Sequence, residues 1–212
     1  MLTPLVVLLA VLGAAWGLVA DRIAARWPAH DDGTVRPIDW RTPIAVAVGG
    51  LALAAVPVRF ADPTAAIIFG AYVVALVLLL ATDLDQRLLP NEITLPAIPI
   101  AFVVTLAGLN PLVAPSSLPI AIAAAVLIPG VIFALSIPFG AGAFGLGDVK
   151  LLVSVGLLAG AYRLFAAVAY GLVLGGVVIL ALLIARRIGR KSYVPFGPFL
   201  IVGALWAILV LR

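Results

Sequence analysis

Two short acidic motifs contain the side chains of this sequence that could carry out chemistry. The first holds Asp83 and Asp85, and the second is the run Gly145-Leu146-Gly147-Asp148-Val149-Lys150. Both adjoin long apolar runs, where an ionised carboxylate is costly and is therefore a functional candidate by default. Two carboxylates that meet in a poorly hydrated site share one proton. One can then take a proton from water while the other polarises a carbonyl group, which predicts general acid/base hydrolysis.

Residue types that other catalytic and metal sites need are scarce. The chain has no cysteine, and His30 is its single histidine, which removes thiolate chemistry and imidazole clusters. We therefore expect no metal site and no cofactor. The net charge of +4 does not indicate nucleic acid, because the basic residues stand in short loops between apolar runs, where they set membrane orientation.

Composition identifies the surroundings in which these motifs must work. In 212 residues, 65% are hydrophobic and 10% are charged, and the mean hydropathy is +1.31. Soluble domains carry about 25% charged residues, so this chain is expected to lie in a membrane. Backbone groups in hydrocarbon must satisfy one another within helices or closed barrels, and the alternating strands of a barrel are not evident here. The sequence predicts an all-α, polytopic membrane helix bundle.

About eight transmembrane helices are expected if each crossing takes about 20 apolar residues. They are predicted near 2–20, 43–58, 64–82, 95–110, 117–138, 149–162, 165–185 and 198–211. The first is expected to be a retained helix, because a basic segment and a small-residue cleavage site of a signal peptide are missing. The polar loop at 21–42 is too short to form a domain of its own. Residues 1–212 are therefore expected to form a single integral membrane domain.

The distribution of basic residues predicts the orientation. With the N-terminus outside, ten of the thirteen lysines and arginines fall in cytosolic loops, where such residues collect. These ten are Arg22, Arg26, Arg36, Arg41, Arg87, Lys150, Arg186, Arg187, Arg190 and Lys191. Only Arg59, Arg163 and Arg212 remain outside. Both acidic motifs are then expected at the cytosolic face of the membrane.

Less specific interpretations of the motifs remain open on these grounds alone. Asp83 and Asp85 could lie among solvated headgroups and pair with Arg87, and Asp148 could form a simple ion pair with Lys150. Gly145 and Gly147 could let a substrate strand approach the backbone, or could serve helix packing. A small ion-coupled transporter that binds a proton or cation with the same carboxylates is the main alternative from another class.

Both motifs together resemble the signature of the type IV prepilin peptidases, intramembrane aspartic proteases of the GxGD type. In that family an aspartate is followed seven and eight residues later by Pro and by Asn or Asp, matched here by Asp83, Pro90 and Asn91. The second signature, Gly-x-Gly-Asp, is matched at 145–148, and the run 195–199 (PFGPF) resembles a further segment of bacterial members. The resemblance implies that Asp83 and Asp148 are catalytic, with Asp85 in reserve.

The resemblance also implies a substrate and a product. The substrate would be the leader of a prepilin or pseudopilin, cleaved after a glycine at the cytosolic membrane face. Many bacterial members also methylate the new N-terminus and carry a longer loop with paired Cys-x-x-Cys motifs. Since the loop at 21–42 is short and has no cysteine, methyl transfer is not expected here. Helix dipoles predict that Asp148, at a helix start, is the base, and that Asp83, at a helix end, is the acid.

Overall fold

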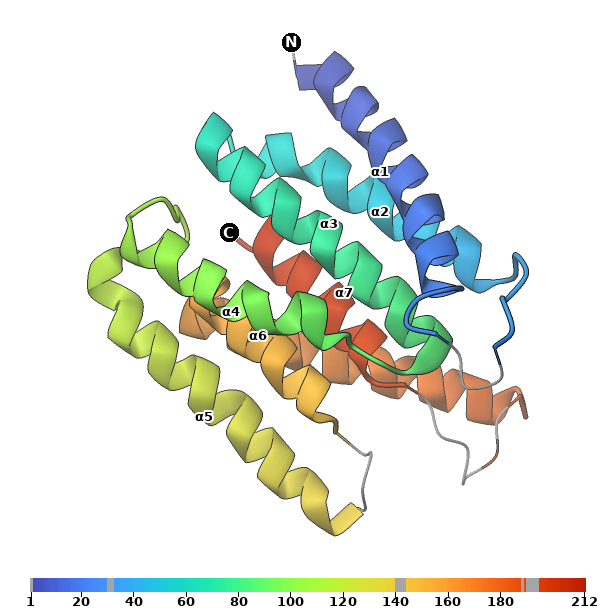
Figure 1. Ribbon diagram of the computed structural model, residues 1–212. Coiled ribbons are helices and arrows are strands. Elements are labelled where there is room, and N and C mark those ends of the chain that lie inside the picture. Colours follow the sequence, from blue (N-terminus) through green and yellow to red (C-terminus); the bar gives the residue numbers. More distant parts are fainter. Residues whose placement is uncertain (1, 30–32, 140–143, 188, 190–194) are drawn as a thin grey trace.

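A computed structural model describes the chain except for residues 1, 30–32, 140–143, 188 and 190–194 (Figure 1). His30, Arg190 and Lys191 therefore lie outside the described residues. Helices dominate the described part, in which no strand occurs, so the prediction of an all-α fold is confirmed. The α-helices there are α1 (Leu2–Ala24), α2 (Arg41–Arg59), α3 (Pro63–Gln86), α4 (Asn91–Leu106), α5 (Leu118–Ser136), α6 (Leu146–Ile184) and α7 (Gly197–Leu209).

Five of these helices are long and apolar enough to cross a membrane, namely α1, α2, α3, α5 and α6. Two apolar helices, α4 and α7, are shorter. The predicted count of about eight spans is therefore not confirmed. The difference arises partly because α4 and α7 are too short to count as full crossings. The two helices expected at 149–162 and 165–185 lie on either side of a break at Gly160 and share the label α6.

The break in α6 lies at Gly160, whose φ of 80° and ψ of 170° are open mainly to glycine. A break inside a membrane helix leaves carbonyl groups without their helical donors, and these must find others. Thr105 donates to the carbonyl of Leu157 at 3.0 Å, and Asn110 donates to that of Leu158 at 2.9 Å. Polar side chains from the end of α4 and the loop after it thus supply hydrogen-bond donors to the carbonyl groups at the break.

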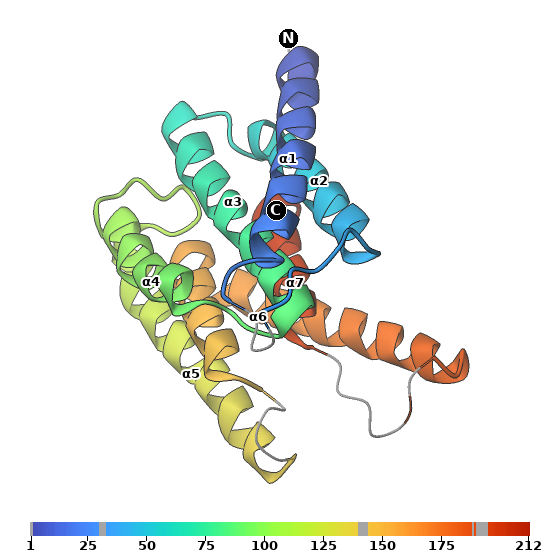
Figure 2. The same ribbon diagram turned by 45° about the vertical axis from the view of Figure 1, so that its right-hand side comes forward.

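The helices form two groups on either side of a central pair. In both views, α1 and α2 lie on one side of α3 and α7, and α4 and α5 lie on the other (Figures 1 and 2). Helix α7 packs against both α3 and α6, and α6 packs against α4 and α5. Tyr72 of α3 and Ser154 of α6 form a buried hydrogen bond of 2.8 Å. The helices that carry the two acidic motifs are thereby tied together.

Helices α1 and α2 touch along their backbones. A Cβ atom added to Gly13 would collide with the carbonyl oxygen of Gly49, and one added to Gly49 would collide with that of Gly13. Small residues allow such contact in membranes, where van der Waals packing and not the hydrophobic effect drives helix association. The glycines of this pair therefore have a packing role.

We predict that Gly49→Val lowers the thermal unfolding midpoint of the detergent-purified protein. The added side chain must push α1 away from α2, which costs roughly 1–3 kcal/mol. The matched control is Gly130→Ala in α5, because nothing lies within 4 Å of a Cβ at that position. Equal midpoints for the two variants would contradict the close packing of α1 on α2.

Candidate active site

Asp83 occupies the last turn of α3. Arg87 follows that helix in the left-handed region, with φ 56° and ψ 38°, and its N–H donates to the carbonyl of Asp83. This cap ends the helix, and the chain then turns toward Pro90, which precedes α4. The carboxylate of Asp83 is held at the helix end but away from solvent, since the residue is 5% exposed.

Asp148 occupies the first turn of α6. The helix begins at Leu146, after Gly145 in an extended conformation, and the Oδ2 atom of Asp148 accepts a hydrogen bond of 3.0 Å from the N–H of Gly145. The start of a helix carries unpaired N–H groups and a partial positive charge, both of which stabilise an anion. The half-buried Asp148 is thus well placed to carry a negative charge.

The two carboxyl groups meet at Gly197, the first residue of α7. A Cβ atom built on Gly197 would lie 2.5 Å from Oδ2 of Asp83 and 3.1 Å from Oδ1 of Asp148. The two oxygens can therefore be no farther apart than the sum of these distances. Oδ2 of Asp83 is also buried with no hydrogen-bond partner among the described residues. Such an oxygen is the exception in folded proteins and is free to bind a water or substrate group.

A cavity of about 410 Å³ opens at this point and collects most of the predicted site residues. It is lined by Pro28, Asp83, Arg87, Leu88, Leu89, Pro90, Asn91, Glu92, Gly145, Gly147 and Asp148. Lys150 does not line it but donates to the side chain of Asn91, at 2.5 Å, and so joins the start of α4 to the first turn of α6. Asp85 is not among the lining residues.

Gly147 has a steric reason to be glycine. A Cβ atom at this position would lie 3.0 Å from the Cβ of Leu89, in the chain that links α3 to α4. The glycine thus lets the segment after Asp83 lie close to the segment before Asp148. Gly145 has more room, because the nearest atom to its Cβ would be Oδ2 of Asp148 at 3.6 Å.

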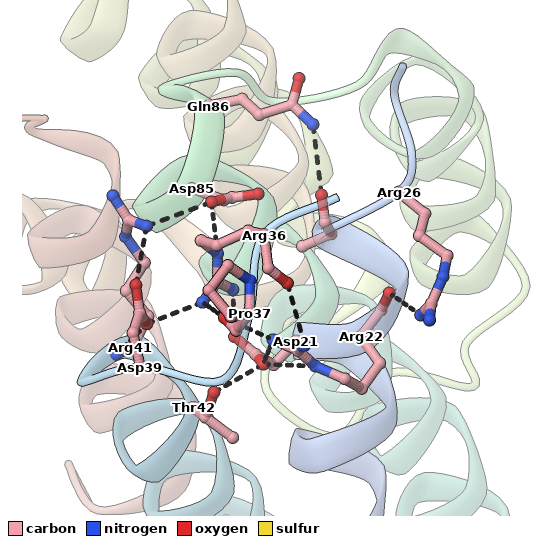
Figure 3. Close-up of polar contacts among 11 residues, drawn as sticks. Asp21, Arg22, Arg26, Arg36, Pro37, Asp39, Arg41, Thr42, Asp85 and Gln86 are labelled. Carbon is pink, nitrogen blue, oxygen red and sulfur yellow. Dashed lines mark hydrogen bonds and ion pairs between the residues drawn. The ribbon is translucent and has the colours of Figure 1, made fainter. Parts of the chain in front are cut away.

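Asp85 belongs instead to an ion-pair cluster with Arg36, Arg41 and Asp21 (Figure 3). Its Oδ1 lies 2.6 Å from Nε of Arg36 and 3.3 Å from Arg41, and its side chain is 2% exposed. Arg36 also pairs with Asp21, which accepts from Thr42 at 2.7 Å. These ion pairs explain why an aspartate stands at position 85 without assigning it a catalytic role.

The cluster fixes the loop between α1 and α2 against the end of α3. Although burial disfavours the charged form of Arg36, its hydrogen bond to Asp21 and the surrounding aspartate charges outweigh that cost and raise its pKa. Gln86 adds a hydrogen bond of 2.7 Å to the carbonyl of Pro28, a residue that lines the cavity. Helix α1 extends to Ala24, so Asp21 and Arg22, expected in the loop, are helical.

Sequence reasoning missed Gly197 as part of the site. The run at 195–199 contributed to the resemblance, but nothing in it indicates which residue would touch the aspartates. Only the arrangement of α7 between α3 and α6 brings its first residue to both carboxyl groups. Among the described residues, no group of three or more His, Asp or Glu side chains could hold a metal ion.

The apolar helices and the two carboxyl groups that meet at one cavity place the protein among membrane proteins with a carboxylate site. Comparison with known proteins is more specific: residues 70–180 match the type IV leader peptidase family, and the chain belongs to that family. The chain is 26% identical over 172 residues to the prepilin leader peptidase/N-methyltransferase of Bacillus subtilis (strain 168), covering 81% of this chain and 67% of that protein. No solved structure matches.

We predict that Gly197→Ala abolishes most peptidase activity while the protein still accumulates in the membrane. The added methyl group would occupy the space between the two carboxyl groups and displace at least one of them. A misplacement of about 1 Å in a reacting group costs about 100-fold in rate. The matched control is Gly176→Ala in α6, where nothing lies within 4 Å of an added Cβ. Normal turnover by Gly197→Ala would contradict the tight dyad.

We also predict that Arg36→Gln strongly destabilises the protein. Removing this cation leaves Asp21 and Asp85 as buried charges with too few partners, and breaking a buried pair from one side costs about 3–5 kcal/mol. Thermal unfolding in detergent would measure the loss. Arg26→Gln is the control, because Arg26 is exposed and, among the described residues, its side chain donates only to the carbonyl of Arg22. Equal unfolding midpoints for both variants would show that the cluster adds nothing to stability.

Proposed function

We propose that this chain is an aspartic endopeptidase that removes the leader of type IV prepilins or pseudopilins at the cytosolic membrane face. Asp83 and Asp148 are its catalytic pair. The observation that carries the proposal is the approach of both carboxyl groups to Gly197. One buried oxygen of Asp83 also has no hydrogen-bond partner in the part of the chain that the structure describes. Membership of the type IV leader peptidase family supports the substrate class.

The proton starts on Asp83 in the proposed reaction. Asp148 carries the negative charge, because the N–H of Gly145 and the start of α6 stabilise an anion there. Asp83 lies at the opposite kind of helix end, where an anion is disfavoured, and it is more deeply buried. The unpartnered Oδ2 of Asp83 is then the atom that donates to the scissile carbonyl.

Hydrolysis follows from that distribution. Asp148 takes a proton from a water molecule as the water oxygen attacks the carbonyl carbon, and Asp83 gives its proton to the carbonyl oxygen. When the tetrahedral intermediate collapses, the C–N bond breaks, the leaving amine takes the proton from Asp148, and the new carboxyl group returns a proton to Asp83. No covalent enzyme intermediate and no metal ion is required.

The cavity is open to an extended segment of substrate, which fits a cut at the junction of a leader and a membrane helix. Its lining includes Pro90 and Asn91 at the start of α4, Gly145 just before α6 and Gly147 in the first turn of α6. Lys150 acts through its bond to Asn91 and positions that wall. Residues 1–212 act as a single membrane domain in this proposal, with the N-terminus outside.

Two alternatives carry less weight. A transporter with the same carboxylates has no support from the comparisons, and both aspartates lie at helix ends, whereas transporter sites lie near the middle of the bilayer. The name of the B. subtilis relative also includes an N-methyltransferase. The short loop without cysteines favours peptidase activity alone for this chain, and methyl transfer remains predicted to be absent.

The decisive experiment is cleavage of a co-reconstituted prepilin by the wild type, Asp83→Asn and Asp148→Asn. Each variant keeps the size and hydrogen-bonding shape of the side chain but loses its acid/base function. We expect cleavage to fall about 100- to 10,000-fold in both, the range that one general acid or base contributes. Membrane accumulation and the thermal midpoint should stay close to those of the wild type.

Glu92→Gln is the matched control, since it removes another carboxylate that lines the cavity. It should cleave at close to the normal rate. Cleavage retained by either aspartate variant would refute the pair. Cleavage lost in all three variants alike would point instead to a general need for negative charge in the cavity, for example to attract a basic leader.

A further inference from the structure

We propose that the end of the molecule opposite the active site holds a binding site for the phosphate group of an anionic membrane lipid. Arg59, Arg163 and Arg212 form it. They line one cavity of about 880 Å³ together with apolar residues of α2 and α7. The three are also the basic residues that the count of charges leaves on the non-cytosolic side.

The site lies far from the aspartate pair along every helix involved. Arg59 ends α2, whose first residue, Arg41, contacts Asp85. At a rise of 1.5 Å per residue, the helix separates the two arginines by about 27 Å. Arg163 follows the break at Gly160, and Arg212 follows α7, which begins at Gly197. In Figure 1 the C-terminus lies toward the start of α3, away from the end that carries the active site.

These arginines have no carboxylate side chain to balance them. The sequence contains no Asp or Glu from residue 149 to residue 212, and between residues 43 and 82 it contains only Asp62. Asp62 caps the start of α3, where its side chain accepts a bond of 2.7 Å from the N–H of Ala65. Three cations that share one cavity repel one another, so an anion supplied from outside would stabilise them.

The donors of the cluster are only partly used. Arg59 reaches the carbonyls of Ile208 and Leu211 through Nε and one terminal nitrogen, at 3.3 and 3.4 Å. Nε of Arg163 is buried and has no hydrogen-bond partner in the described part of the chain. A guanidinium group presents a planar fork that matches the oxygens of a phosphate. The cluster therefore offers unfilled donors of the kind that phosphate accepts.

The walls of the cavity indicate a lipid as the source of the phosphate. Ala54, Ala55, Val58, Leu209 and Val210 complete the lining. Val58 and Val210 are 63% and 60% exposed, a degree that is ordinary for side chains facing acyl chains. A charged group beside an apolar, outward-facing wall suits a molecule with a phosphate head and a hydrocarbon tail. Topology does not explain these arginines, since positive residues collect on the cytosolic side.

Lipid retention measured by native mass spectrometry tests the proposal. The full-length protein is purified from bilayers that contain equal amounts of phosphatidylglycerol and phosphatidylcholine. We expect the wild type to retain one phosphatidylglycerol in preference to phosphatidylcholine, and the Arg59→Gln/Arg163→Gln variant to lose this preference by about tenfold or more. Since Arg59 also holds the end of α7, Arg163→Gln alone serves if the double variant fails to accumulate.

Arg187→Gln is the matched control, because it removes an exposed arginine from the loop after α6. It should retain phosphatidylglycerol as the wild type does. Equal retention by the wild type and Arg163→Gln, or equal loss in Arg187→Gln, would overturn the site. Inorganic phosphate is the second probe: if it raises the thermal midpoint in detergent as much as phosphatidylglycerol does, the assignment to a lipid is wrong.

Discussion

The structure depends on bringing two carboxyl groups together in a place that is poor in water. Burying either carboxylate in its charged form costs free energy, and two charged carboxylates repel one another unless they share a proton. Helix α7 makes the approach possible, since its first residue has no side chain to stand between Asp83 and Asp148. The caps at Arg87 and Gly145 then fix the ends of α3 and α6 around that point.

Much of this arrangement follows from the sequence, because membrane helices are long apolar runs that end at polar residues. The predicted spans near 43–58 and 64–82 lie within α2 and α3, and the two motifs lie at helix ends as expected. The number of spans was harder to predict, since hydropathy does not show that α4 and α7 are shorter than a full crossing. The division of α6 at Gly160 does match the two helices predicted there. The role of Gly197 depends on a contact between distant segments, which no local pattern specifies.

The charged cluster around Arg36 shows a second limit of sequence reasoning. Asp85 stands two residues from Asp83, so its spacing alone made it a reserve catalytic residue. In the fold, successive side chains on a helix point about 100° apart, and Asp85 turns toward the loop between α1 and α2. There it pairs with Arg36 and Arg41, both of which are partly buried. Asp85 is thus engaged by arginines, whereas Asp83 lines the cavity that we propose as the active site.

The length of α7 has a consequence for the surrounding bilayer. Its 13 residues span about 20 Å, whereas the hydrocarbon core is about 30 Å thick. The part of α6 that precedes Gly160 is of similar length. Helices this short create hydrophobic mismatch, which a bilayer relieves by thinning. Such a depression next to Gly197 would bring water down to the carboxyl groups, so the reaction and its solvent could meet without a channel through the protein.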